Sequence, residues 1–190
     1  SDVRDQPSRE LLSSMSLVFQ DVMLSTDTIR ANIALGNADA TNHEIEEAAK
    51  AACIHDRIMQ LPDGYDTIIG EGAHLSGGEA QRLTIARAFL AASPILILDE
   101  ATAQADSHSE RLIQQAISNL AQKRTVIVIA HRLSTIQGVD QIAVIDTGRI
   151  VDLGTHDELL TRDGPYARLW RNQTDITHAR EGIEGKEPAC

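Results

Sequence analysis

Two adjacent carboxylates follow a short run of apolar residues in the middle of the chain. Residues 95–98 are Ile-Leu-Ile-Leu and lead directly into Asp99 and Glu100. This pattern predicts a buried strand whose carboxyl end carries the acidic pair, where ligands of open α/β sheets bind. Mg²⁺ prefers carboxylate and water oxygens, and Glu100 could polarise a water molecule for attack on a phosphoryl group. A solvated strand end is the alternative, and the dipeptide alone does not decide between them.

A serine and two glycines stand at the expected start of a helix. Ser76 can cap a helix that runs to about Ala92, where Pro94 prevents its continuation. Gly77 and Gly78 leave the first backbone N–H groups accessible, and these groups, with the helix dipole, favour an anion such as phosphate. The same sequence is equally typical of an ordinary capped helix, so composition alone leaves both interpretations open.

Two further polar residues follow expected strands. His131 comes after the apolar run 125–130, and Gln20 comes after residues 15–19. Because the carboxyl ends of parallel strands share one edge of a sheet, His131 is expected near the acidic pair, where it could donate to a phosphate oxygen. Gln20 could hold water or a metal ion. A capped strand end and a plain loop glutamine are the respective alternatives.

Composition limits the class of protein. The chain has 190 residues, of which 42% are apolar and 24% charged, as expected for one globular domain with a core. Its net charge of −11 disfavours binding to nucleic acid through a general basic field. Cys53 and Cys190 lack metal-ligand spacing, which favours reduced thiols in the cytosol. The start at Ser1, without a leader, favours a fragment, a cleaved product or an engineered piece.

Helices and short strands are expected to position these residues. Residues 28–35 predict a short helix, 42–59 a longer one, and 109–122 a crossover helix between strands 95–98 and 125–130. These strands and 142–145 lack polar alternation, as expected for parallel strands covered on both faces. Residues 146–149 predict a hairpin turn into 150–153.

Five features occur together in the order and approximate spacing of one known family. They are Gln20 within Val-Phe-Gln-Asp, LSGGEAQR at 75–82, ILILDE at 95–100, Ala105-Asp106, and His131. On these motifs the chain resembles the ATP-binding domain of ABC transporters from about residue 2 to residue 173, and LSGGEAQR is the most specific part. Residues 28–30, 61–66, 130–136 and 154–160 resemble the exporter type, whose membrane domain is fused ahead of the ATPase.

The resemblance implies an α/β fold, a partial P-loop NTPase (ABC ATPase) fold with a mostly parallel sheet flanked by helices and a helical subdomain. One partial ATPase domain is expected over residues 1–174, with the helical subdomain at about 24–92 and catalytic-core strands before and after it. Residues 175–190 are expected to form a mobile tail.

The resemblance also implies a role for each motif. Asp99 would organise Mg²⁺, Glu100 would act as general base, His131 would contact the γ-phosphate of ATP, and Gln20 would sense metal and water while linking to the membrane domain. Ser76, Gly77 and Gly78, in the signature motif LSGGEAQR, would clamp the nucleotide bound to a second ABC ATPase domain, identical or different. Asp106 would lie in a loop that crosses the dimer interface. The residues assigned to nucleotide binding are Ser76, Gly77, Gly78, Glu79 and Asp106.

Further expectations concern the membrane. Residues 69–74 would face the coupling helices of the transporter's transmembrane domain. The chain would work at the cytoplasmic face of the cell membrane, and no nucleic acid is expected as a partner.

Three departures from the family stand out. No Gly-x-x-x-x-Gly-Lys-Ser/Thr loop occurs in the sequence, so the main cradle for the β- and γ-phosphates is absent. The isolated chain is therefore expected to be inactive, and its sheet to have an exposed edge. Three residues, where exporters usually have four, separate Gly70-Glu71 from Leu75-Ser76. The loop Ala103-Gln104-Ala105-Asp106 replaces Ser-Ala-Leu-Asp and resembles loops of exporter-like proteins that handle siderophores, although no substrate is assigned from it.

Three functions remain in view. The first is a fragment of an ATP-driven transporter. The second is a natural half-domain that does not hydrolyse ATP and supplies its signature helix to a partner ATPase. The third is a soluble ABC protein of repair or translation, against which the exporter-like details count.

Overall fold

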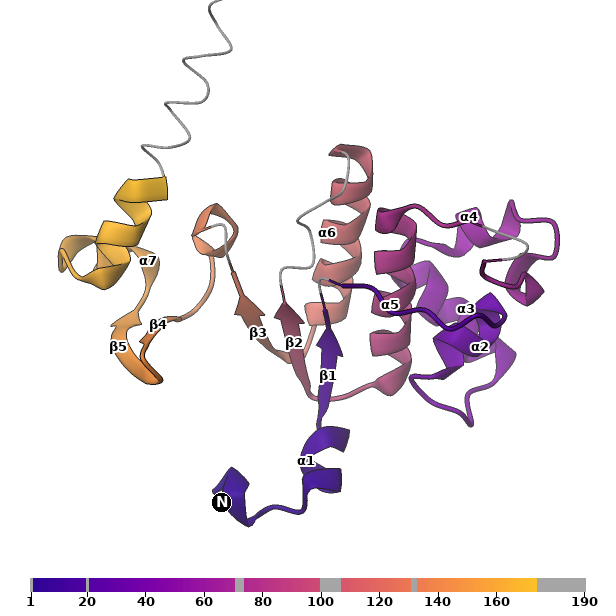
Figure 1. Ribbon diagram of the computed structural model, residues 1–190, viewed down its shortest axis with the longest axis horizontal. Helices are drawn as coiled ribbons and strands as arrows, with labels where there is room; N and C mark the ends of the chain where they lie inside the picture. The colour runs from indigo at the N-terminus through magenta and orange to yellow at the C-terminus, as the bar shows by residue number, and fades with distance from the viewer. Residues whose placement is uncertain (1, 20, 71–73, 100–106, 131–132, 174–190) are drawn as a thin grey trace, which may run out of the picture. The chain divides into compact units, whose positions relative to one another are not determined.

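The computed structural model describes residues 2–19, 21–70, 74–99, 107–130 and 133–173 (Figure 1). The chain divides into two compact units, Ser1–Ile129 and Ala130–Cys190, and each is described by itself. Within the described ranges, no helix has both the length and the apolar character needed to cross a bilayer. The expected tail at 175–190 lies outside the described residues.

A three-stranded parallel sheet organises the first unit. Its strands are β1 (Met15–Val18), β2 (Ile95–Asp99) and β3 (Thr125–Ile129), in the order β1-β2-β3. Met15 pairs with Ile95, which pairs with Thr125, so the three carboxyl ends lie at one edge. Helix α6 (Ser107–Ala121) connects β2 to β3. The predicted parallel strands and helical crossover are confirmed for this part of the chain.

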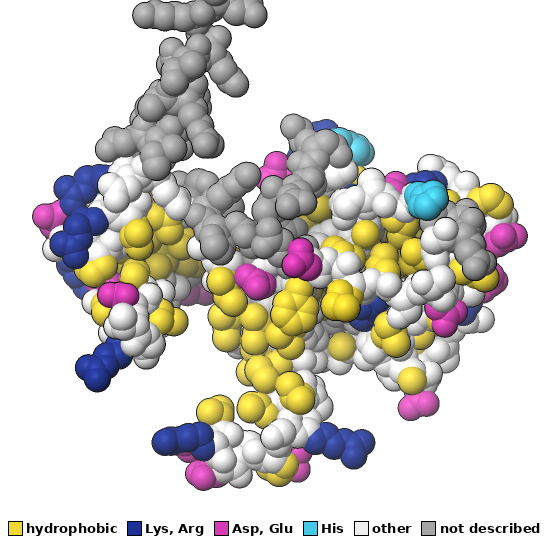
Figure 2. All heavy atoms as spheres, in the orientation of Figure 1, with side chains coloured by type: hydrophobic (Ala, Val, Ile, Leu, Met, Phe, Trp, Pro, Cys, Tyr) yellow, Lys and Arg dark blue, Asp and Glu magenta, His cyan; other side chains and the backbone are white. Residues whose placement is uncertain are grey.

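The two faces of this sheet differ in burial. Leu96 and Leu98 on β2 and Val18 on β1 are buried against helices. Leu17 and Ile127 occupy the opposite face, in register with Ile97, and are 43% and 49% exposed. Figure 2 shows apolar side chains gathered over the strands. Within the first unit, the described residues therefore cover one face of these strands and leave the other face exposed.

Helix α5 (Gly77–Ala91) lies between the sheet and a group of shorter helices (Figure 1). Its Leu83, Ile85 and Ala86 are fully buried in one apolar core with strand and α6 side chains. Ser76 caps its start and Ala92, with a positive φ, ends it. These bounds agree with the predicted helix. The shorter elements of this unit are η1 (Val3–Asp5), α1 (Ser8–Ser13), α2 (Ile29–Ala34), α3 (Asn42–Ala51), α4 (His55–Met59) and η2 (Gly64–Asp66).

The predicted long helix over residues 42–59 is wrong, because α3 and α4 are separate. Cys53 has φ 55°, the left-handed conformation that ends helices. The Cys53 N–H donates to the carbonyl of Lys50 at 3.0 Å, and the Ile54 N–H to that of Ala49 at 3.0 Å. This pair of hydrogen bonds is a Schellman motif. Glycine usually marks that position, so a cysteine there gave no signal in the sequence.

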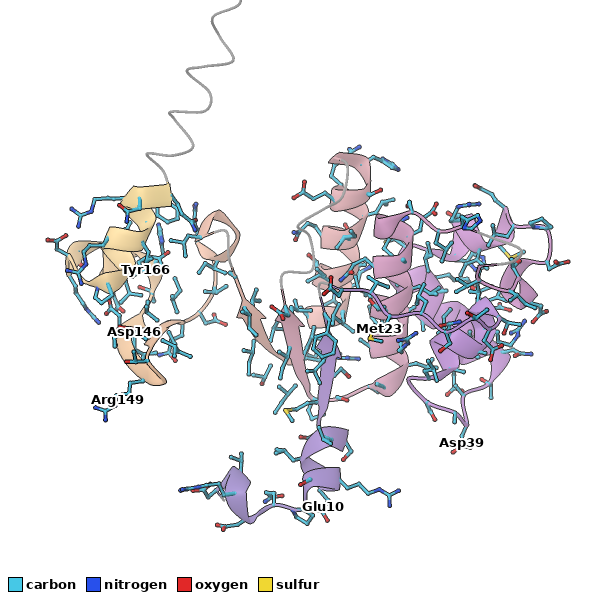
Figure 3. All side chains as sticks on the ribbon, in the orientation of Figure 1. Glu10, Met23, Asp39, Asp146, Arg149 and Tyr166 are labelled. Atoms are coloured by element: carbon cyan, nitrogen blue, oxygen red, sulfur yellow. The ribbon has the colours of Figure 1, made fainter. Side chains whose placement is uncertain are left out.

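A buried asparagine joins α2 to α5. Asn32 is fully buried, and its side-chain amide donates to the carbonyls of Ser25 and Thr28, both at 3.0 Å. Arg87 on α5 donates to the Asn32 carbonyl at 2.9 Å and to the carbonyl of Met23 at 3.2 Å. Figure 3 labels Met23 beside α5. The amide thus satisfies several buried polar groups at once.

The second unit contains an antiparallel hairpin of β4 (Ile142–Asp146) and β5 (Arg149–Gly154). Thr147 and Gly148 both have positive φ, as a type I′ turn requires, which confirms the predicted turn. The hairpin ends at Asp146 and Arg149 (Figure 3). The expectation that residues 142–145 form a parallel strand is wrong, since β4 pairs antiparallel with β5. The other described elements are η3 (Leu133–Ile136), α7 (His156–Thr161) and a helix at 165–173.

The two sheet faces predict opposite responses to the same kind of truncation. We expect Leu96→Ala, at a fully buried site, to lower the free energy of unfolding by about 3 kcal/mol. Ile127→Ala, at a half-exposed site on the same sheet, should cost less than about 1 kcal/mol. Urea denaturation of the two variants measures the difference. Equal losses would contradict the assignment of one uncovered face.

The buried amide predicts a large effect of a polar truncation. Asn32→Ala should destabilise the chain by about 2–4 kcal/mol, because it removes the partner of part-buried backbone groups and of Arg87 Nη2, which donates to Asn32 Oδ1 at 3.3 Å. The matched control is Asn37→Ala, since Asn37 is exposed and accepts one local hydrogen bond from the Asp39 N–H. That variant should change stability by less than about 1 kcal/mol in the same urea titration.

Candidate functional site

The first turn of α5 is closed by a reciprocal capping box. The Glu79 N–H donates to Ser76 Oγ at 3.3 Å, and the Ser76 N–H donates to Glu79 Oε2 at 2.8 Å. Ser76 is therefore held in an extended conformation directly before the helix. Gly77 and Gly78 occupy the two intervening positions, where backbone N–H groups have no partner within the helix. A helix start of this kind favours an anion.

The two glycines have different structural environments. A Cβ at Gly78 would lie 2.7 Å from the Cβ of Ser109 on α6, so close packing of α5 on α6 excludes a side chain. A Cβ at Gly77 would meet nothing within 4 Å, and its φ is not positive. Neither packing against the described residues nor backbone conformation thus requires glycine at position 77. A ligand or partner that approaches the backbone closely would require it.

An arginine from another helix contacts the capping glutamate. Arg57 Nε on α4 donates to Glu79 Oε1 at 2.7 Å, and the two side chains are 32% and 18% exposed. Burial alone would raise the pKa of the Glu79 carboxyl, but hydrogen bonds from the Ser76 N–H and Arg57, with the charge of Arg57, outweigh it and lower that pKa. Both carboxylate oxygens are engaged within the chain.

The carboxyl edge of the sheet lies next to α5 through one buried contact. Gln81 is buried and its Nε2 donates to the carbonyl of Phe19, just past β1, at 3.2 Å. Asp99 is the last residue of β2, on the same edge. Asp99 therefore lies at the carboxyl edge of the sheet, and the Gln81–Phe19 hydrogen bond connects that edge to α5.

Several predicted site residues fall outside the described part of the chain. These are Gln20, Glu100, Asp106 and His131, together with residues 71–73. In the sequence, Gln20 comes shortly after β1, Glu100 directly after β2, and His131 two positions after the end of β3. The parallel register places the ends of these three strands at a common edge. Among the described residues no group of three or more His, Cys, Asp or Glu side chains could hold a metal ion. The assigned roles therefore stay predictions.

Two contacts of the site were not predicted from the sequence. Arg57 lies 22 residues before Glu79, and Gln81 lies 62 residues after Phe19. Neither spacing corresponds to a local motif. The Ser76–Glu79 box does have a sequence signal, a serine followed three residues later by glutamate.

Comparison with known proteins agrees with this geometry. A profile of the family described as ABC transporter matches residues 1–103. The chain is 54% identical over 169 residues to the mycobactin import ATP-binding/permease protein IrtA of Mycobacterium tuberculosis, covering 89% of this chain and 20% of that protein. It is 51% identical over 174 residues to the putative multidrug export ATP-binding/permease protein YgaD of Bacillus subtilis, covering 91% and 30% respectively.

A solved structure shows the same fold. The chain superposes on a bacterial Atm1-family ABC exporter with ATP bound with a TM-score of 0.81 at 46% identity, covering 91% of this chain and 30% of that one. The predicted α/β fold of P-loop NTPase type is confirmed by this likeness. The chain spans between a fifth and three tenths of the length of these relatives. It is similar to the ATP-binding part of exporter-type proteins, and it belongs to the ABC transporter family.

Proposed function

We propose that the chain is the signature-bearing part of the nucleotide-binding domain of an ATP-driven transporter. In a dimer of such domains, the start of α5 contacts the phosphates of MgATP held by the second domain, identical or different. Asp99 organises Mg²⁺ and Glu100 acts as the general base. His131 contacts the γ-phosphate, and Gln20 senses metal and water while linking to a transmembrane domain. Binding and hydrolysis then drive transport of a substrate, at the cytoplasmic face of a membrane.

The observation that carries this proposal is the open environment of Gly77. Gly77 is the first residue of a well-capped helix, and nothing within the described chain requires glycine there. Its backbone N–H group is accessible to a ligand from outside the chain. The 46% identical exporter was solved with ATP bound, which supports a nucleotide as that ligand. The neighbouring Gly78 is also assigned to nucleotide binding, but the packing of α5 on α6 already requires glycine there, so it does not discriminate.

A missing phosphate cradle limits what the 190 residues do alone. No Gly-x-x-x-x-Gly-Lys-Ser/Thr loop is present in the sequence, and within the first unit the described residues leave one apolar face of the sheet exposed. Both features support a further protein segment that supplies the phosphate loop and packs on that face. The same missing loop also fits a natural half-domain that lends its signature helix to an intact partner ATPase.

The two glycines provide an internal test of ligand contact. Gly77→Ala should leave the isolated chain as stable or stabilise it by about 0.5 kcal/mol, since alanine favours the helix, yet impair ATP hydrolysis in the full-length protein. Gly78→Ala should destabilise the isolated chain by about 1–3 kcal/mol because of its clash with Ser109. Urea denaturation and an ATPase assay measure both effects. Full activity of Gly77→Ala would contradict the nucleotide contact.

A second prediction separates the fragment from the half-domain. The isolated chain should show essentially no ATP turnover, whereas the protein extended upstream through a phosphate loop should hydrolyse ATP. In that extended protein, Glu100→Gln should lower kcat by about 100-fold or more, because it removes the general base. Turnover by the isolated chain that depends on Glu100 would refute the proposal. Stimulation of an intact ATPase partner by the isolated chain would favour the half-domain.

A further inference from the structure

Three capping boxes in the chain allow a direct comparison. Each joins a serine or threonine to a glutamate three residues later, before α3, α5 and α7: Thr41–Glu44, Ser76–Glu79 and Thr155–Glu158. Among the described residues Glu44 forms its box without an ion pair, and the Arg162–Glu158 pair is a local one, exposed and 3.8 Å long. A capping box therefore forms without a distant arginine. Only at α5, among the boxes of the described chain, does a half-buried arginine from another helix complete it.

The arginine is held in place by its own helix. Ile54, the N-cap of α4, and Ile58 within it are 1% exposed and belong to the main apolar core. The Schellman motif that ends α3 fixes the entry to α4, with Cys53 in the left-handed conformation. Arg57 thus reaches Glu79 from a packed helix rather than from a mobile loop.

The charge of Glu79 at this helix start would oppose the binding of an anion without Arg57. A carboxylate in the first turn lies close to the N–H groups that attract phosphate, and like charges repel most strongly where water is partly excluded. Glu79 is 18% exposed, so solvent screens its charge only partly. The guanidinium at 2.7 Å neutralises that charge and leaves Ser76 capped.

We propose that Arg57 is a positioning and charge-compensating residue for nucleotide contact at the start of α5. It acts through Glu79 and does not touch the ligand: it fixes the carboxylate that holds Ser76 and cancels the negative charge that would repel the phosphates. This inference rests on the proposed function for its consequence in ATP binding. Both oxygens of Glu79 already accept hydrogen bonds within the chain, and the assignment of Glu79 to nucleotide binding stays a prediction.

The experiment uses charge rescue in the full-length protein. Arg57→Gln should raise KM for ATP by about five- to tenfold with a smaller change in kcat, because it leaves the Glu79 charge uncompensated. Arg57→Lys should recover part of the loss, since lysine keeps the charge but lacks the guanidinium geometry. In a Glu79→Gln background, where glutamine still forms the capping box but carries no charge, adding Arg57→Gln should change KM by less than about twofold.

Comparing the two backgrounds distinguishes this role from a purely structural one. If the ion pair served only stability, Arg57→Gln would raise KM by the same factor with glutamate and with glutamine at position 79, or in neither background; both results overturn the proposal. The matched control is Asp66→Asn, which removes the Arg30–Asp66 pair of 3.0 Å within the same group of helices. It should leave KM unaltered.

A second measurement keeps the inference separate from the proposed function. In the isolated chain, hydrogen exchange of the amides at residues 76–80 should accelerate by about fivefold in Arg57→Gln, and less in the control Asp66→Asn. Unchanged exchange would overturn the positioning role whatever the ATPase result. If the unsubstituted full-length protein hydrolyses no ATP, the proposed function fails, while the exchange data still decide whether Arg57 fixes the start of α5.

Discussion

The start of α5 combines unsatisfied N–H groups with the carboxylate of Glu79 and the guanidinium of Arg57. Helix N-termini attract anions, and a chain that supplies its own carboxylate there satisfies the helix but discourages a phosphate. The ion pair between Arg57 and Glu79 removes this conflict, because the carboxylate caps Ser76 while its charge is neutralised from α4. The external surface of the helix start is then left to the backbone at Gly77.

The rest of the first unit fixes α5 in three directions. Gln81 ties its second turn to the carbonyl at the end of β1, and Arg87 ties its fourth turn to Asn32 on α2. Gly78 permits the close approach of α6, which connects the strand ending in Asp99 to β3. A shift of α5 would therefore disturb the sheet edge and the helical group together. This coupling explains why a single helix can carry the signature and also organise the core.

Local sequence signals predicted the elements whose boundaries are set by local chemistry. The α5 cap at Ser76 and the hairpin turn at Thr147-Gly148 are such cases, since both depend on a few adjacent residues. The break at Cys53 was missed because a left-handed cysteine replaces the usual glycine. The pairing of β4 was missed because apolar runs without alternation do not distinguish parallel from antiparallel partners. Arg57 was missed because its contact depends on the tertiary packing of α4.

For the site, the sequence could predict only which residues lie at the ends of strands and at the start of α5. The register of β1, β2 and β3 follows from the fold and places the ends of these strands at one edge. The absence of a phosphate loop can be read directly from the sequence. The exposed face of the sheet in the first unit cannot, because apolar residues of β1 and β3 have the same sequence pattern whether or not anything packs on them. The missing phosphate loop and the exposed sheet face are independent observations, the first about chemistry and the second about packing. A single segment that carries a phosphate loop and packs on the exposed face of this sheet would account for both observations.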